Sequence, residues 1–182
     1  MRSVILAVAL VLALTPLSLL FDPLWAAPIA VLSTVSVIAV GALARSLSPR
    51  GGMNAVLQLG AIVVGATILD VCVGTQSGRT LNPATWIDAH LSLIDASARQ
   101  LSSTYPPVPG SPELTVMLAL VIALVTLLID ILFTDLAWRT PTAITLLCIA
   151  LIPAVHVGDD VSWAVYVGPI AGAALILASD AL

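Results

Sequence analysis

Charge is the property that this sequence has least of. Charged residues make up 9% of the 182-residue chain, and lysine is absent, so that all 6 basic residues are arginine. A soluble domain carries about 25% charged residues, and a nucleic-acid-binding domain has a basic patch that this chain lacks. Hydrophobic residues make up 60%, and the mean hydropathy is +1.14. The composition excludes an ordinary soluble domain and a nucleic-acid partner, and it predicts a helical membrane protein.

Cysteine and histidine are also scarce, with 2 residues of each type. Cys72 and Cys148 both fall in apolar runs. Their expected depths differ by roughly 9 Å, whereas a disulfide requires Cα atoms within about 7 Å of each other. We therefore interpret both cysteines as small buried residues that form no disulfide and act as no nucleophile.

Motifs for metal binding and catalysis are missing as well. The residues that would invite a metal site come from separate segments and show no His-x-x-His or His-x-x-x-His spacing: Asp70, His90, His156, Asp159 and Asp160. A zinc site needs converging ligands, which such spacing supplies. The sequence contains no nucleophile elbow and no glycine-rich phosphate loop. We therefore predict no metal, no cofactor and no enzymatic activity.

Long apolar runs are abundant instead. A helix needs about 20 apolar residues to cross a hydrocarbon core of about 30 Å. The central run, residues 114–138, reaches this length. We predict an all-α membrane protein that forms a single domain over residues 1–182, with six transmembrane helices at residues 4–20, 26–44, 55–74, 114–138, 140–156 and 163–179.

The outer loop, residues 75–113, is the one long connection, and it contains a predicted surface helix. Its apolar and polar residues recur at helical spacing and form two opposite stripes. The apolar stripe is Ile87, Leu91, Ile94, Ala98 and Leu101, and the polar stripe is Asp88, Ser92, Asp95 and Arg99. Trp86 would help to seat such an amphipathic helix at the membrane surface. We therefore expect an interfacial helix in this loop.

The arginines divide unequally between the two sides of the predicted bundle. Alternate connections carry four arginines on one side and two on the other: Arg2, Arg45, Arg50 and Arg139, against Arg79 and Arg99. Connections rich in arginine face the cytoplasm in membrane proteins. We therefore predict that both termini are cytoplasmic and that the interfacial helix lies on the outer side.

Asp130 is the strongest candidate for a functional residue. It lies roughly 12 Å from the inner end of its predicted helix, and an ionised carboxylate deep in a span costs about 2.5–3.5 kcal/mol. We expect it to face the bundle interior, to be protonated or to have a partner. A proton or ion relay and a polar clamp between helices both fit this expectation. Asp70, near the end of the third span, is the second intramembrane acid.

Asp135 and Arg139 close the central span. They are four residues apart, which predicts an ion pair on one helix face at the cytoplasmic boundary. Asp130 and Asp135 are five residues apart, so at 100° per residue they should point about 140° away from each other. We therefore expect that the two carboxylates do not form one paired site.

Gly168 and Gly172 form a Gly-x-x-x-Gly pair in the sixth span, with Pro169 beside the first glycine. Glycines at this spacing let two helix backbones approach closely. A broken helix that binds a ligand is the alternative reading of the same residues. We interpret the pair as a helix-packing site with a kink.

The order of these features resembles the N-terminal membrane domain of the bacterial transglutaminase-like TgpA family. The likeness lies in an acid-containing fourth helix that runs into Arg-x-Pro and then into a helix with a late proline, LLIDILFTDLAWRTPTAITLLCIALIPA. The residues that carry it are Asp130, Asp135, Arg139, Pro141 and Pro153. The resemblance implies a bacterial inner-membrane protein of the cell envelope. It also implies an extracytoplasmic catalytic domain, which these 182 residues do not contain.

We therefore expect a non-catalytic membrane anchor or interaction module of a transglutaminase-like cell-envelope protein. Its partners would be the lipid bilayer and either a membrane protein or the missing extracytoplasmic domain. A small transporter or ion-conducting subunit that uses Asp130 is one alternative. An accessory subunit of a larger membrane complex, held through the face that carries Gly168 and Gly172 and through the outer helix, is another.

Overall fold

Helices make up most of the chain that the structure describes. This computed structural model describes residues 2–47, 51–73, 83–157 and 162–179. Within these ranges the chain forms seven α-helices and no named strand, which confirms the all-α class. The α-helices are α1 (Arg2–Ala13), α2 (Pro23–Leu47), α3 (Gly51–Val73), α4 (Pro83–Ser103), α5 (Pro112–Asp130), α6 (Arg139–Val157) and α7 (Val167–Ala178).

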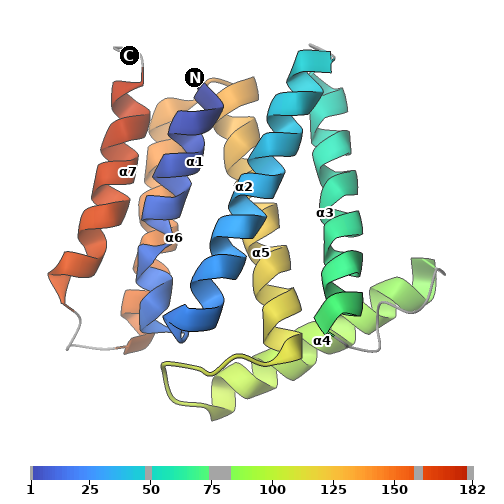
Figure 1. Cartoon of the computed structure of the whole chain (residues 1–182). Coiled ribbons are helices and arrows are strands. Elements are labelled where there is room, and N and C mark those ends of the chain that lie inside the picture. Colours follow the sequence, from blue (N-terminus) through green and yellow to red (C-terminus); the bar gives the residue numbers. More distant parts are fainter. Residues whose placement is uncertain (1, 48–50, 74–82, 158–161, 180–182) are drawn as a thin grey trace.

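Six of these helices run alternately up and down beside one another, and α4 lies across one end of them (Figure 1). α1 begins and α7 ends at the other end of the bundle, where α2 also ends and α6 begins. Three short segments link or extend the α-helices: the 3₁₀ turns η1 (Thr15–Leu19) and η4 (Trp163–Tyr166), and the π-helix η3 (Ile131–Asp135). Within the described part of the predicted loop 75–113, the chain forms the helix α4.

Four helical stretches in the described chain are long and apolar enough to cross a membrane, judged by length and composition. They are Arg2–Leu19, Pro23–Leu47, Met53–Val73 and Pro112–Asp135. Two further apolar helices, Arg139–Pro153 and Trp163–Ala178, are shorter. The chain is therefore compatible with a membrane protein.

The helix ends follow from local chemistry. Pro112 lies in the first turn of α5, where its missing N–H costs no helical bond, and the Ser111 hydroxyl accepts a hydrogen bond from the Leu114 N–H at 3.2 Å. The predicted 114–138 helix ends at Asp135, because the chain turns at Ala137, whose φ is 54°. Such left-handed backbone stops a right-handed helix. α6 then begins at Arg139.

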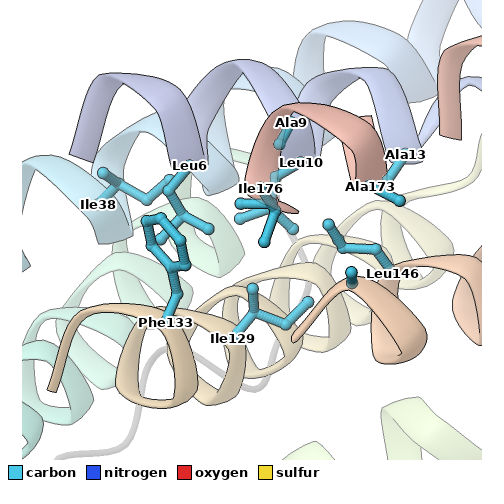
Figure 2. Close-up of a cluster of buried hydrophobic side chains, with 11 residues drawn as sticks. Leu6, Ala9, Leu10, Ala13, Ile38, Ile129, Phe133, Leu146, Ala173 and Ile176 are labelled. Carbon is cyan, nitrogen blue, oxygen red and sulfur yellow. The ribbon is translucent and has the colours of Figure 1, made fainter. Parts of the chain in front are cut away.

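One hydrophobic core joins α1, α2, α5, η3, α6 and α7 (Figure 2). Apolar side chains from all of these elements converge there. Its buried residues include Leu6, Leu10, Ile129, Phe133, Leu146, Ala173 and Ile176. A second core, which contains Phe21, Ala30, Val108, Leu114 and Leu118, lies toward the α4 end. The first core holds α1 against the end of α5, and the second holds the start of α2 against the start of α5.

Gly168 and Gly172 place α7 against the backbone of α1. A Cβ atom on Gly172 would lie 2.6 Å from the Ala9 carbonyl oxygen, and one on Gly168 would lie 2.7 Å from the Leu12 carbonyl oxygen. Real Cβ atoms do not approach oxygen so closely, because the van der Waals contact distance is about 3.5 Å. The two glycines therefore allow close helix contact within the chain itself.

α4 is held to the bundle at both of its ends. Near its start, Trp86 Nε1 donates to the Thr67 hydroxyl of α3 at 3.1 Å. Near its end, the Gln100 side-chain oxygen accepts from the Ser111 hydroxyl at 2.7 Å. Its apolar stripe is only partly covered, since these side chains remain exposed: Ile87, Leu91 and Ile94. α4 is thus an amphipathic helix whose uncovered apolar edge lies beside the bundle.

The extended segment before α5 is anchored to the connection between α1 and α2. The Val108 N–H donates to the Leu20 carbonyl at 2.7 Å, and the Val108 carbonyl accepts from the Asp22 N–H at 3.2 Å. A Cβ on Gly110 would lie 2.9 Å from the Trp25 ring, so glycine lets the segment pass under the indole. These bonds fix where α5 starts.

Replacement of Gly172 by alanine should weaken the α1–α7 contact. The added methyl must displace the Ala9 carbonyl, and overpacking of this kind costs about 1–3 kcal/mol. We expect a lower midpoint of thermal unfolding in mild detergent, followed by circular dichroism. Gly65→Ala is the matched control, because a Cβ there meets no atom within 4 Å. Equal midpoints for the two variants would contradict the assigned contact.

Candidate functional site

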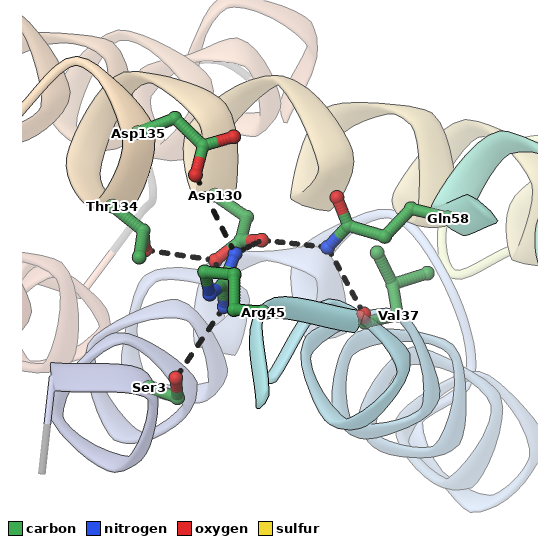
Figure 3. Close-up of polar contacts among 7 residues, drawn as sticks. All are labelled: Ser3, Val37, Arg45, Gln58, Asp130, Thr134 and Asp135. Atoms are coloured by element: carbon green, nitrogen blue, oxygen red, sulfur yellow. Dashed lines mark hydrogen bonds and ion pairs between the residues drawn. The ribbon is translucent and has the colours of Figure 1, made fainter. Parts of the chain in front are cut away.

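Asp130 lies at the centre of a buried polar cluster near the end of the bundle where α1 begins (Figure 3). It is the last residue of α5 and is 0% exposed. Arg45 of α2 holds it in a two-pronged ion pair, with Nη1 at 2.7 Å from Oδ2 and Nη2 at 3.2 Å from Oδ1. Parallel bonds of this kind combine charge with fixed geometry, so they are among the strongest in proteins.

Two further donors complete the environment of the Asp130 carboxylate. Gln58 Nε2 of α3 donates to Oδ2 at 2.6 Å, and the Thr134 hydroxyl donates to Oδ1 at 2.9 Å. Asp130 therefore accepts four hydrogen bonds, two on each oxygen. An ionised carboxylate offers about four lone-pair sites, so every one of them is occupied by a side chain of the protein.

The partners of Asp130 also hold one another. Arg45 Nη2 donates to the Ser3 hydroxyl of α1 at 3.4 Å, and Gln58 Nε2 donates to the Val37 carbonyl of α2 at 3.3 Å. The cluster thus links α1, α2, α3 and α5 through polar contacts. The Arg45 side chain is 18% exposed, so its guanidinium lies at the border between the buried cluster and the surface.

Gly41 makes room for the cluster. A Cβ atom at this position would lie 2.0 Å from Gln58 Nε2 and 2.7 Å from Asp130 Oδ2. Only a residue without a side chain allows the amide and the carboxylate to meet against α2. The sequence signal for this role is weak, because glycine is also common in membrane helices for general packing.

The π-helix η3 corrects the prediction that Asp130 and Asp135 point apart. The Leu136 N–H donates to the Ile131 carbonyl at 3.0 Å, an i to i+5 bond that widens the turn. Residues five apart then lie on one face, so Asp135 Oδ1 comes within 3.9 Å of Arg45 Nη1. The expectation of separate carboxylates was wrong because it assumed 100° per residue. The two acids share one arginine.

The continuous helix face that was predicted to carry Asp135 and Arg139 is interrupted, and their ion pair stays a prediction. The chain turns at Ala137, so that Asp135 ends η3 and Arg139 begins α6. The ion pair that the structure shows for Asp135 is with Arg45. Sequence reasoning missed this partner because it ended the second span at residue 44, whereas α2 continues to Leu47 and carries Arg45 in its last turn.

Asp70, the second acid that the sequence places in a predicted span, lies elsewhere. Asp70 is 0% exposed and lies in the last turn of α3, roughly 18 Å along that helix from Gln58 at 1.5 Å per residue. Asp130 and Asp70 therefore belong to separate sites. Near the Asp70 end, His90 of α4 stacks on Trp86, with ring centroids 3.9 Å apart, and its Nδ1 lies 2.9 Å from the Trp86 carbonyl.

The other candidate residues do not gather into a site. Asp159 and Asp160 and the His156 side chain lie outside the residues that the structure describes. Among the described residues no group of three or more His, Cys, Asp or Glu could hold a metal ion. Cys72 and Cys148 are free and exposed, which corrects the prediction that both are buried. The sequence of an apolar helix does not tell which of its residues face the core of the bundle and which face outward.

Neutralisation of Asp130 should destabilise the bundle. Asp130→Asn keeps the size of the side chain but leaves Arg45 with only the more distant Asp135 carboxylate, and breaking a buried ion pair costs about 3–5 kcal/mol. We expect a large fall in the thermal midpoint and in the yield of folded protein. Asp95→Asn is the matched control, because its ion pair with Arg99 is exposed and should contribute under about 1 kcal/mol.

A double-mutant cycle separates the ion pair from other effects. If Arg45 and Asp130 stabilise each other, then Arg45→Gln combined with Asp130→Asn should cost less than the sum of the two single variants. Strict additivity of the unfolding free energies would argue against the coupling.

Replacement of Gly41 by alanine should disturb the same cluster from the side of α2. The new methyl must push the Gln58 amide away from Asp130, at a cost of about 1–3 kcal/mol. Gln58→Ala in the same chain should recover part of this loss, because it vacates the space nearest to the methyl. Thermal unfolding of the two single variants and of the double variant tests this. A double variant that loses more stability than the sum of the two single variants would refute the steric explanation.

Comparison of the chain with protein-family models, with curated proteins and with solved structures finds no match. The resemblance to the TgpA family therefore rests on the sequence motif alone, and the function has to be argued from the geometry. The feature most informative for that purpose is the occupied carboxylate of Asp130, since it limits what the cluster can do.

Proposed function

We propose that this chain is a non-catalytic helical membrane module that anchors or assembles a cell-envelope protein in the bacterial inner membrane. The observation that carries the proposal is the complete set of donors around Asp130. A relay carboxylate must bind and release a proton or ion, which requires a free lone pair. Asp130 has its four sites filled by side chains from α2, α3 and η3, so it acts as a clamp.

Six membrane spans are part of the proposal. α6 and α7 are shorter than the four long apolar stretches, but they run alongside α1 over the length of the bundle (Figure 1). They also share the buried core of α1 and α5. Since the stretch Arg2–Leu19, which contains α1 and η1, qualifies by length and composition, its neighbours at the same depth would meet the same hydrocarbon.

The charge distribution supports cytoplasmic termini. Arg45 and Arg139 lie at the end of the bundle where α1 begins with Arg2, and Arg99 lies on α4 at the opposite end (Figure 1). The positive-inside rule favours the arginine-rich end as the cytoplasmic one. α4 would then lie at the outer membrane surface, with the exposed side chains of Ile87, Leu91 and Ile94 toward lipid.

A module of this kind needs a partner, and the TgpA resemblance indicates an extracytoplasmic transglutaminase-like domain or a protein that carries one. α4 is the part of the chain closest to such a domain in the proposed orientation. The hydrogen bonds of Trp86 and Gln100 attach α4 to the bundle, as a helix that positions an attached domain would require. Asp88, Asp95 and Arg99 would form the side that faces water.

A small ion-conducting subunit remains the second candidate, and one observation favours it. Asp130 and Asp135 share Arg45, so the three side chains carry a net charge of minus one when all are ionised. π-helical turns such as η3 often occur at functional sites. A proton or cation could balance this charge.

A flux assay separates the two candidates. We would reconstitute the purified chain in liposomes, impose a potassium diffusion potential and follow proton entry with an internal pH-sensitive dye. The anchor function predicts the same proton entry as in protein-free liposomes. Proton flux above that background, abolished in a folded Arg45→Gln, Asp130→Asn double variant, would support the conducting subunit and overturn the clamp.

A further inference from the structure

Two buried amide oxygens of α3 have no hydrogen-bond partner within the described chain. They are Oδ1 of Asn54 and Oε1 of Gln58. Asn54 is 2% exposed and Gln58 is 0% exposed, so both oxygens are shielded from bulk water. A buried acceptor without a donor is rare in native proteins, and it points to a bound water or ion.

The orientation of the Gln58 amide is determined by its nitrogen. Nε2 donates to two acceptors, the Asp130 carboxylate at 2.6 Å and the Val37 carbonyl at 3.3 Å. A flipped amide would place the oxygen against both of these acceptors, where it could form no hydrogen bond. Figure 3 shows Oε1 turned aside from the two bonds of the nitrogen. This oxygen therefore needs a positive or donor group of its own.

Asn54 and Asp135 lie one turn closer to the end of the bundle where α1 begins than the bond between Gln58 and Asp130. α3 and α5 run in opposite directions (Figure 1). Asn54 is four residues before Gln58 and shares its helix face. Asp135 is five residues after Asp130 and shares its face through the π-helix η3. The Asn54 and Asp135 side chains are therefore carried by facing surfaces of α3 and η3.

The charges of the cluster leave one carboxylate without an equal counter-charge. Arg45 and Asp130 balance each other in their two-pronged ion pair. Asp135 reaches the same arginine only at 3.9 Å, which is beyond hydrogen-bond distance. Its side chain is 16% exposed, so it lies between the buried amides and the surface. A bound ion could reach the amides along this side chain.

The chemistry of these three oxygen-bearing side chains suits a hard cation. Carboxylate and amide oxygens bind such cations, and one uncompensated negative charge is balanced by a monovalent ion. A water molecule could donate to the amide oxygens, but it would leave the charge unbalanced. This ligand set differs from clusters of histidine, cysteine and acids, because two of its three members are amides.

We propose that a monovalent cation binds between the amide oxygens of Asn54 and Gln58 and the carboxylate of Asp135. Water from the exposed side of Asp135 would complete its coordination. The ion would join α3 to η3 one turn beyond the clamp. This site goes beyond the anchor function, which requires no ligand, and it does not depend on that function.

Binding of radioactive sodium to the purified full chain in detergent tests the site. Scintillation proximity counting measures the bound ion, and choline chloride keeps the ionic strength constant so that screening does not change. We expect saturable binding of one sodium ion per chain. Sodium binding that does not saturate would show counter-ions near the surface only, and it would overturn the proposal, as would the absence of binding.

Substitutions at Asn54 then assign the ion to the amides. Asn54→Leu removes the oxygen but keeps the approximate size, and it should weaken sodium binding about tenfold or more, because even outer-shell partners of metal sites contribute this much. Asn54→Asp should bind sodium more tightly, since added ligand charge raises the affinity of oxygen sites. An Asn54 amide that instead donates to Asp135 predicts the opposite sign. Weaker binding in Asn54→Asp than in the unaltered chain would therefore overturn the assignment.

The acid of the site has a matched control. Asp135→Asn removes its charge and should abolish sodium binding, while Asp130 keeps its four hydrogen bonds. Asp95→Asn removes an acid from the exposed ion pair with Arg99 and should leave the binding unchanged. Equal sodium binding in these two variants would overturn the site.

Thermal midpoints without sodium report whether each variant is folded. If Asn54→Leu is not folded, Asp135→Asn decides the assignment in its place. The liposome flux assay is carried out on the same preparation. Saturable sodium binding supports the site whether or not protons enter the liposomes, so that a failure of the anchor function is distinguishable from a failure of the cation site.

Discussion

The buried carboxylate of Asp130 sets the main constraint on this bundle. In an apolar interior an ionised group is tolerated only when it is paired and hydrogen-bonded. Arg45, Gln58 and Thr134 meet that requirement from α2, α3 and η3. Since each donor has to reach the same two oxygens, the relative heights of the helices are determined at this point. The need for glycine at position 41 follows directly, because any side chain would occupy the space of the amide and the carboxylate.

The π-helix that follows Asp130 changes the chemistry of the cluster. A regular α-helix would have turned Asp135 away, and Arg45 would then have served one acid. The wider turn brings the second carboxylate to within 3.9 Å of Arg45. The arginine therefore sits between one fully satisfied acid and one that is more weakly held. The same turn ends at Ala137 with a left-handed residue, which redirects the chain into α6.

Much of the fold could be predicted from the sequence, whereas the site could be predicted only in part. Continuous apolar runs identified the helices other than α4, which was identified by the helical spacing of its apolar and polar residues. Asp130 stood out because a carboxylate in an apolar run is costly. The partner Arg45 did not stand out, because it lies 85 positions from Asp130 in the chain and was assigned to a turn. Gln58 was missed as a single amide in an apolar run. Cys72 and Cys148 were placed wrongly because lipid is as apolar as a protein core, so hydrophobicity does not distinguish inside from outside.

The distribution of polar contacts bears on which function is plausible. Polar contacts between helices are concentrated near the two ends of the described bundle, at the Asp130 cluster and at the Trp86 and Gln100 attachments of α4. Most of the buried side chains between these ends are apolar, although the hydroxyls of Thr34 on α2 and Thr126 on α5 are buried there too. A conducting path would need polar groups that continue through this middle part. A module tied at both ends and largely apolar between them instead resists relative sliding of its helices, as an anchor that positions an attached domain would require.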